Sequence, residues 1–192
     1  MEIEVNIPNG ESGAWKIEEF EVSEKDVEIF NLRAMFHPGC RIMYPGKYKK
    51  LTRNGEVIMS NTHSEIEDHS HFIYNAKRYG GNILINGLGL GVALIEILKS
   101  DLVKKVTVVE KSEDVIKLVA PYFSNDKRVK IIHADALEFK PPKEEFYDFV
   151  WHDIWDDITA DNLPEMRKLH RKYGKKTNWQ GSWCRDLCER YK

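Results

Sequence analysis

In the middle of the chain, a glycine-rich segment follows one apolar segment. Carboxylate residues follow each of the next three apolar segments. The carboxylates are Glu110, Asp135, Asp153 and Asp156, and the glycine-rich segment covers residues 87–91. A glycine loop between a strand and a helix lets the backbone approach a ligand closely. Each feature also has a purely structural interpretation, as a tight turn, a solvated acid or a helix cap. Their regular recurrence favours a shared ligand site.

The segments between these residues alternate in character and predict the elements that position them. Strands are expected at 83–85, 105–109, 129–133 and 146–151, and helices at 92–99, 112–122, 161–173 and around 183–191. Alternating strands and helices predict a parallel sheet with right-handed crossovers. The carboxyl ends of such strands meet at one crevice, so the four acids should lie together.

The N-terminal third has a different pattern. Residues 1–40 are expected to form an irregular arm with short strands. Residues 41–61 should form a β-hairpin around Asn54-Gly55, since both residues tolerate positive φ. A capping box at Ser64-x-x-Glu67 then predicts the start of a helix that Gly80-Gly81 ends.

The residue types indicate a nucleoside ligand without phosphates. A carboxylate at 110 can accept hydrogen bonds from a ribose diol, and one at 135 can accept from the exocyclic amine of a purine. Val92 stands where a dinucleotide-binding loop needs its last glycine, and no Gly-Lys-Ser/Thr sequence is present. An adenosine with a cationic sulfur suits an acidic crevice better.

On these motifs the chain resembles the class I S-adenosylmethionine-dependent methyltransferases, and within them the spermidine synthases, which carry Asp-x-x-Asp after the fourth strand, as Asp153 and Asp156 do here. The resemblance implies an α/β fold with a Rossmann-like core over 62–192, strand order 3-2-1-4, and a small β subdomain over 1–61. It implies S-adenosylmethionine, or its decarboxylated form, as the cofactor. The cofactor-binding residues so predicted are Asn86, Gly87, Leu88, Gly89, Gly91, Glu110, Lys111, Asp135, Ala136 and Asp153.

Two acids are the predicted catalytic residues. Asp153 is the expected base, and Asp156 is expected to assist it or to bind a cationic amine. The resemblance also implies substrate contacts for Asp68 and His69, and Trp155 could stack on an acceptor. His152 should point to the opposite face of its strand and is interpreted as a packed histidine.

Three features depart from the resembled families. Ile85 replaces the acid that methyltransferases usually carry before the first glycine. Leu90 replaces the aspartate with which spermidine synthases help to hold the aminopropyl amine. Only 39 residues follow Asp153, so strands five to seven are expected to be absent, apart from one short strand at 177–180. The N-terminal arm, the C-terminal helix or a second subunit of a homodimer must then cover the acceptor side.

Three hypotheses for the function remain open. The leading one is a methyltransferase acting on a small-molecule acceptor. The alternatives are a spermidine-synthase-like aminopropyltransferase and a non-catalytic protein that binds an adenosyl ligand. Residues 164–192 carry nine Lys/Arg against three Asp/Glu, so the basic helix at 163–176 keeps a nucleic-acid partner open, although the sequence disfavours it.

Composition excludes several other classes of protein. The hydrophobic residues make up 42% of the chain and the charged residues 31%, as in a globular domain rather than a disordered one. No apolar run reaches the length of a membrane span, and the acidic N-terminus lacks a signal pattern, so a cytoplasmic location without membrane contact is expected. Pairing of His37 and Cys40 with Cys184 and Cys188 at zinc is considered, but no metal site is predicted.

Overall fold

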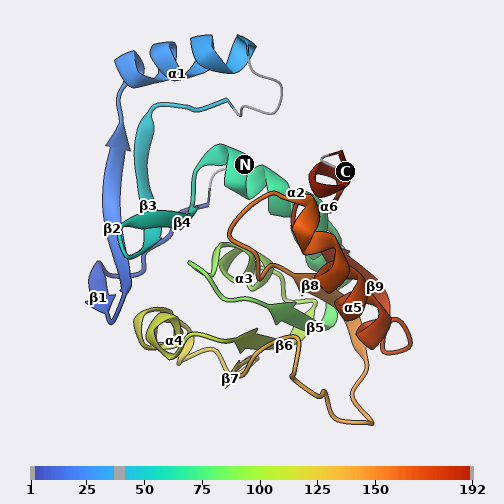
Figure 1. Cartoon of the computed structure of the whole chain (residues 1–192). Coiled ribbons are helices and arrows are strands. Elements are labelled where there is room, and N and C mark those ends of the chain that lie inside the picture. Colours follow the sequence, from blue (N-terminus) through green and yellow to red (C-terminus); the bar gives the residue numbers. More distant parts are fainter. Residues whose placement is uncertain (1–2, 37–41, 191–192) are drawn as a thin grey trace.

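The computed structural model describes residues 3–36 and 42–190, which form two β-sheets (Figure 1). The N-terminal sheet is antiparallel, with the order β1-β2-β3-β4. Its strands are β1 (Gly10–Ser12), β2 (Trp15–Val22), β3 (Gly46–Arg53) and β4 (Glu56–Ser60). Asn54 and Gly55 have φ values of 52° and 86° in the turn between β3 and β4. The predicted hairpin is therefore confirmed.

Helix α1 (Glu24–Phe36) was not predicted, because its segment was expected to be irregular. Ser23 and Asp26 start it with reciprocal hydrogen bonds, in which Asp26 N donates to Ser23 Oγ (3.2 Å) and Ser23 N donates to Asp26 Oδ2 (3.1 Å). The apolar residues of the helix are spread around it rather than forming a stripe, and Ile29, Phe30 and Leu32 are exposed. Periodicity therefore gave no signal here, and only the cap could have indicated a helix.

The second sheet is parallel throughout, in the order β7-β6-β5-β8-β9. Its strands in chain order are β5 (Gly81–Asn86), β6 (Val103–Glu110), β7 (Val129–His133), β8 (Tyr147–His152) and β9 (Thr177–Ser182). The first four confirm the predicted order 3-2-1-4. The one short strand expected at 177–180 is present as β9, which is two residues longer and pairs with β8 from Tyr147↔Thr177 to His152↔Ser182. A polar edge strand gives little hydrophobic signal in a sequence.

Helices cover both faces of the parallel sheet (Figure 1). They are α2 (His63–Tyr79), α3 (Val92–Ile97), α4 (Glu113–Val119), α5 (Leu163–Tyr173) and α6 (Arg185–Arg190), with 3₁₀ turns η1 (Ala120–Phe123) and η2 (Ala160–Asn162). Residues of α2, α3 and α4 share one core cluster with Ile83, Ile85 and Trp151. Leu169 and Tyr173 of α5 pack with Leu84 and other residues on the opposite face. Strand residues therefore alternate between the two faces.

The N-terminal sheet joins the same core as α2, α3 and α4. Ile17 and Leu51 are fully buried in the cluster that also holds Phe72 of α2 and Leu90. The predicted boundary at residues 61/62 falls between β4 and α2. Continuous packing across this boundary fixes the N-terminal sheet over the end of the parallel sheet.

The predicted helix starts had mixed outcomes. Ser112 caps α4 as expected, because its Oγ accepts a hydrogen bond from Val115 N at 3.3 Å. The capping box at Ser64 was wrong: α2 begins at His63, and Ser64 Oγ donates instead to the carbonyl of Ile42 at 2.9 Å. Within residues 3–36 and 42–190, no helix has the length and apolar character needed to cross a bilayer.

Candidate active site

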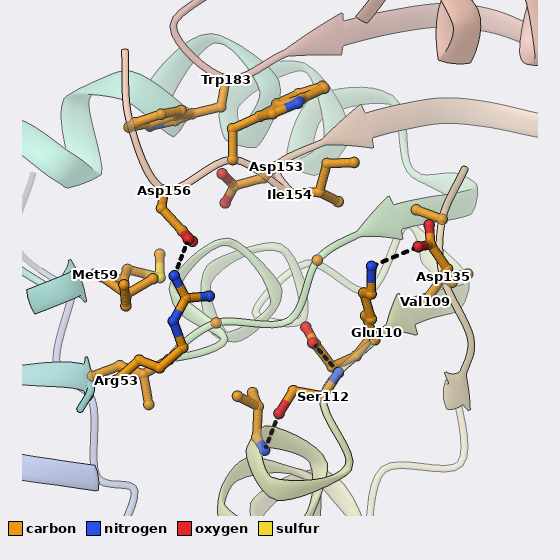
Figure 2. Close-up of a pocket in the computed structure, with 18 of the residues that line it drawn as sticks. Arg53, Met59, Val109, Glu110, Ser112, Asp135, Asp153, Ile154, Asp156 and Trp183 are labelled. Carbon is orange, nitrogen blue, oxygen red and sulfur yellow. Dashed lines mark hydrogen bonds and ion pairs between the residues drawn. The ribbon is translucent and has the colours of Figure 1, made fainter. Parts of the chain in front are cut away.

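A cleft of about 470 Å³ lies at the carboxyl ends of β5, β6, β7 and β8, facing the N-terminal sheet (Figure 2). This volume is typical of a site for a small organic molecule. The N-terminal sheet contributes Trp15, Leu51, Arg53, Ile58 and Met59. The core contributes Glu65, His69, Gly87, Gly89, Val109, Glu110, Lys111, Ser112, Val115, Asp135, Ala136, Leu137, Asp153, Ile154, Trp155, Asp156, Glu165 and Trp183.

The glycine loop needs its glycines for steric reasons. Gly87 has a φ of 99°, and a Cβ there would collide with the carbonyl oxygen of Asp153. Gly89 has a φ of 48° and lies against the sulfur of Met59, which also accepts a hydrogen bond from Leu90 N at 3.3 Å. The loop is therefore packed tightly between the N-terminal sheet and the end of β8. Gly87 and Gly89 still face the cleft.

Glu110 ends β6 and ties two neighbouring loops together. Its Oε2 accepts from Leu88 N at 2.8 Å, and its Oε1 accepts from Ser112 N at 2.7 Å. Each carboxylate oxygen has a second lone pair, so both remain able to accept a hydrogen bond from a ligand. The side chain thus joins the glycine loop to the start of α4 while lining the cleft.

Asp135 lies at the far side of the cleft, after β7 (Figure 2). Its Oδ2 accepts from Lys111 Nζ at 2.8 Å, and its Oδ1 accepts from Leu137 N at 2.8 Å. These bonds, the one from the Lys111 ammonium first, hold the pKa of the Asp135 carboxyl below its ordinary value. Asp135 is therefore ionised at neutral pH, so both of its oxygens can accept hydrogen bonds, for example from an exocyclic amine.

Lys172 of α5 supports the loop that follows Asp135. Its ammonium donates to three backbone carbonyls, those of Ala136 (2.8 Å), Leu137 (2.9 Å) and Phe139 (2.8 Å). Burial lowers the pKa of Lys172. One side chain thereby satisfies three carbonyls of a segment that lines the cleft.

Asp153 lies at the tip of β8 and has the most strongly perturbed carboxyl at the site. Burial, with further contributions from Glu65, Asp68 and other carboxylates, raises its pKa to about 8. Its backbone N–H donates to the carbonyl of Asn86 at 2.8 Å, which fixes it beside the glycine loop. A carboxyl with such a pKa can exchange a proton near neutral pH.

His69 of α2 lies directly against Asp153. The indole N–H of Trp151 donates to His69 Nδ1 at 3.2 Å. Because an indole nitrogen is only a donor, the neutral ring must carry its proton on Nε2. That atom lies 3.8 Å from Asp153 Oδ2. The histidine therefore turns an N–H toward the carboxyl, at a distance longer than a hydrogen bond.

Asp156 does not stand alone at the mouth of the cleft. Its Oδ2 accepts from Arg53 Nη2 of β3 at 2.7 Å (Figure 2). The guanidinium also lies over the ring of Trp15, at 5.4 Å from its centroid. The N-terminal sheet thus supplies a cation to a carboxylate that was expected to bind an amine.

The cleft has a marked excess of carboxylates. Six acidic side chains line it, against the two cations Arg53 and Lys111, and the acidic excess remains when Asp153 is protonated. The six are Glu65, Glu110, Asp135, Asp153, Asp156 and Glu165. Such a surface attracts cationic ligands and disfavours phosphates.

The structure brings most of the predicted site residues to this cleft. Those that line it are Gly87, Gly89, Glu110, Lys111, Asp135, Ala136, Asp153, Asp156, His69 and Trp155. Leu88 and Gly91 lie outside it, although Leu88 supplies the N–H bound by Glu110. Asp68 also lies outside and accepts from the indole N–H of Trp183 at 3.1 Å.

Asn86 points away from the cleft, to the face covered by α5. Its Nδ2 donates to His152 Nδ1 at 2.8 Å, and both side chains are fully buried. His152 Nε2 faces Gln180 Oε1 at 3.3 Å, and burial lowers the pKa of His152 to about 3. His152 is therefore a packed, neutral histidine.

Sequence reasoning missed several lining residues. Arg53 and Met59 come from the hairpin, Glu165 from α5, and Trp183 follows β9. Glu165 accepts from the indole N–H of Trp155 at 2.9 Å. Arg53 and Met59 had little signal in the sequence, because nothing local in a hairpin shows which of its faces packs against another sheet. Among the described residues, no three His, Cys, Asp or Glu side chains gather as a metal site requires, and His37 and Cys40 lie outside these residues.

A family model for the spermine/spermidine synthase domain matches residues 62–172, more than half of the chain. The chain belongs to the spermine/spermidine synthase family. Its relatives include polyamine aminopropyltransferases from Lachnospira eligens (31% identical over 120 residues, 58% of this chain and 42% of the relative) and Prochlorococcus marinus strain AS9601 (32% over 158 residues, 67% and 56%). The chain thus spans about half the length of these curated relatives.

Solved structures agree with this family at the level of the fold. Spermidine synthase from Thermotoga maritima superimposes with a TM-score of 0.55 and 17% identity, covering 96% of this chain and 63% of that protein. The N-methyltransferase NodS from Bradyrhizobium japonicum superimposes with a TM-score of 0.50, 17% identity, and coverage of 65% and 71%. The predicted methyltransferase-type fold in its spermidine-synthase-like branch is confirmed.

Proposed function

We propose that this spermine/spermidine synthase family member transfers an aminopropyl group from decarboxylated S-adenosylmethionine to an amine acceptor. The observation that carries the proposal is the carboxyl of Asp153, with a pKa near 8, in a cleft rich in carboxylates. Family membership supplies the reaction class. This was the alternative rather than the leading hypothesis from the sequence.

The donor fits the chemistry of the cleft. Decarboxylated S-adenosylmethionine carries a sulfonium and an ammonium and no carboxylate, so a surface with five acidic side chains besides Asp153 and only two cations favours it. Glu110 keeps lone pairs for a ribose diol, and Asp135 keeps an ionised carboxylate for an exocyclic amine. Gly87 and Gly89 line the cleft, so the backbone of the glycine loop borders the space beside Asp153.

The reaction is a displacement at carbon. The lone pair of the acceptor nitrogen attacks the aminopropyl carbon bonded to sulfur, and the carbon–sulfur bond breaks. Its electron pair returns to sulfur and leaves neutral methylthioadenosine. The positive charge moves from sulfur to the new secondary ammonium. Alignment of nitrogen, carbon and sulfur by the cleft supplies most of the rate enhancement.

Asp153 is suited to remove the proton that makes the amine nucleophilic. An alkylammonium has no lone pair, so it must lose a proton before it attacks. In its ionised form Asp153 can accept that proton, and its raised pKa makes it a stronger base than an ordinary aspartate. Because its pKa is about 8, Asp153 is ionised in a minority of molecules at neutral pH, and this fraction rises with pH.

Methyl transfer is the second candidate, and one residue favours it. Leu90 is fully buried in the core, where the spermidine synthases that this sequence resembles carry an aspartate for the aminopropyl amine. Without that carboxylate, the cleft has less to hold a decarboxylated donor in the aminopropyl orientation. The same fold and adenosyl contacts would serve S-adenosylmethionine.

Product analysis separates the candidates. The protein is incubated with either donor and a set of amines, and the nucleoside products are identified by mass spectrometry. We expect methylthioadenosine from the decarboxylated donor, and its loss in Asp153→Asn but not in Asp157→Asn, a neighbouring exposed acid that does not line the cleft. S-adenosylhomocysteine instead would indicate methyl transfer. Binding without turnover of any amine would indicate a non-catalytic adenosyl-binding protein.

A further inference from the structure

The ion pair between Arg53 and Asp156 lies at the end of the cleft opposite Asp135 (Figure 2). The two side chains are 42% and 36% exposed, so a ligand in the cleft can reach both. Asp153 and the glycine loop lie between this pair and the Asp135 side (Figure 2). The pair and Asp153 therefore border the same ligand space.

Trp15 holds the Arg53 side chain in place next to Asp156. Arg53 lies directly opposite Trp15 in the pairing of β2 with β3, and its guanidinium covers the Trp15 ring. Among the described contacts, one of its five N–H donors is used, by Asp156. The remaining donors form part of a planar fork that matches a carboxylate. The guanidinium is thus oriented before a ligand arrives.

Charge balance decides which ligand can use this end of the cleft. A simple diamine that bound Asp156 would compete with Arg53 for its carboxylate and would bring a second cation beside the guanidinium, which is unfavourable. A ligand with both an ammonium and a carboxylate can replace the pair group for group. Its ammonium then binds Asp156 and its carboxylate binds Arg53, so that no charge loses its partner.

We infer that this end of the cleft recognises an aminocarboxylate group, with Arg53 as the specificity-determining residue. The inference builds on the proposed function, because it takes this cleft as the substrate site. Two sources share the chemistry: an amino acid as acceptor, and the methionine end of a donor that keeps its carboxylate. The first refines the proposed aminopropyl transfer. The second replaces its decarboxylated donor by the carboxylated one and so corresponds to the second candidate, methyl transfer.

Calorimetry with matched ligand pairs tests the inference. Ornithine and putrescine differ only by a carboxylate, and so do S-adenosylmethionine and its decarboxylated form. The amine pair is titrated into protein saturated with methylthioadenosine, and the donor pair into free protein. We expect the wild type to bind the carboxylated member of one pair about tenfold more tightly, as one charge-assisted hydrogen-bonded contact allows. A preference within the amine pair identifies an amino-acid acceptor, and a preference within the donor pair identifies the methionine end of the donor.

Variants assign the preference to the guanidinium. Arg53→Gln should abolish it, Arg53→Lys should retain part of it, and Asp156→Asn should weaken both members of the pair similarly. Arg171→Gln removes an exposed cation of α5 outside the cleft and should change nothing. Wild-type preference for the decarboxylated member of both pairs, no preference in either, or unchanged discrimination in Arg53→Gln, would overturn the inference. Failure to bind methylthioadenosine would instead count against the proposed function, since that ligand carries no carboxylate.

Discussion

Replacing Asp153 with asparagine should stabilise the protein as well as inactivate it. The carboxyl is held at a pKa of about 8, against an ordinary value of 3.8, chiefly by burial. The folded chain therefore keeps a proton that the unfolded chain releases. The contribution of the protonated Asp153 carboxyl to the free energy of unfolding is present in full below pH 3.8 and is lost as the pH rises toward 8. Asparagine has the same shape and no charge to bury.

The size of the effect follows from this difference in protonation. Each pH unit over which only the unfolded chain releases the proton changes the free energy of unfolding by about 1.36 kcal/mol. Between pH 5 and pH 7 the wild type should lose up to about 2.7 kcal/mol relative to Asp153→Asn. Because the side chain is 22% exposed to the cleft, we expect roughly half of that value.

Urea unfolding at pH 5, 6, 7 and 8 measures this difference directly. The stability of Asp153→Asn minus that of the wild type should grow with pH, while the same difference for the exposed control Asp157→Asn should stay flat. A difference for Asp153→Asn that is constant with pH, or that shrinks as the pH rises, would refute a raised pKa. Turnover by Asp153→Asn should fall by about 100-fold or more, since it lacks the base.

Three further changes test other parts of the site. Gly87→Ala places a Cβ against the carbonyl of Asp153 at a positive φ, so thermal denaturation should show a loss of about 2 kcal/mol or more. Lys172→Met frees three carbonyls of the 136–139 loop and should weaken methylthioadenosine binding about tenfold in calorimetry, with partial recovery in Lys172→Arg. His152 stays neutral to about pH 3, so the wild type should lose stability as the pH falls from 6.5, and His152→Gln should show a smaller acid-induced loss by circular dichroism.

The parallel sheet and its crevice could be predicted because local rules determine them. Strand β7 coincides with the predicted 129–133, and the acids after β6, β7 and β8 meet at one edge because parallel topology leaves no other arrangement. The alternation of side chains also placed His152 correctly. The same rule applied to Asn86, which pairs with His152 across the strands, would have turned it away from the cleft.

The remaining features depend on contacts between distant segments. The pairing of Arg53 with Asp156 joins residues 103 positions apart, and no local pattern encodes it. Strand β9 was underestimated because Thr177–Ser182 is polar, as edge strands often are. Helix α1 lacks an apolar stripe, so hydrophobic periodicity could not reveal it.

The tryptophans divide between two environments. Trp151 of the core and the half-buried Trp179 stack at 6.3 Å between ring centroids, while Trp15, Trp155 and Trp183 line the cleft. Occupancy of the cleft should therefore alter the emission of three of the five indoles. The protein thus has a built-in optical reporter, with which ligands can be screened by fluorescence titration without any label.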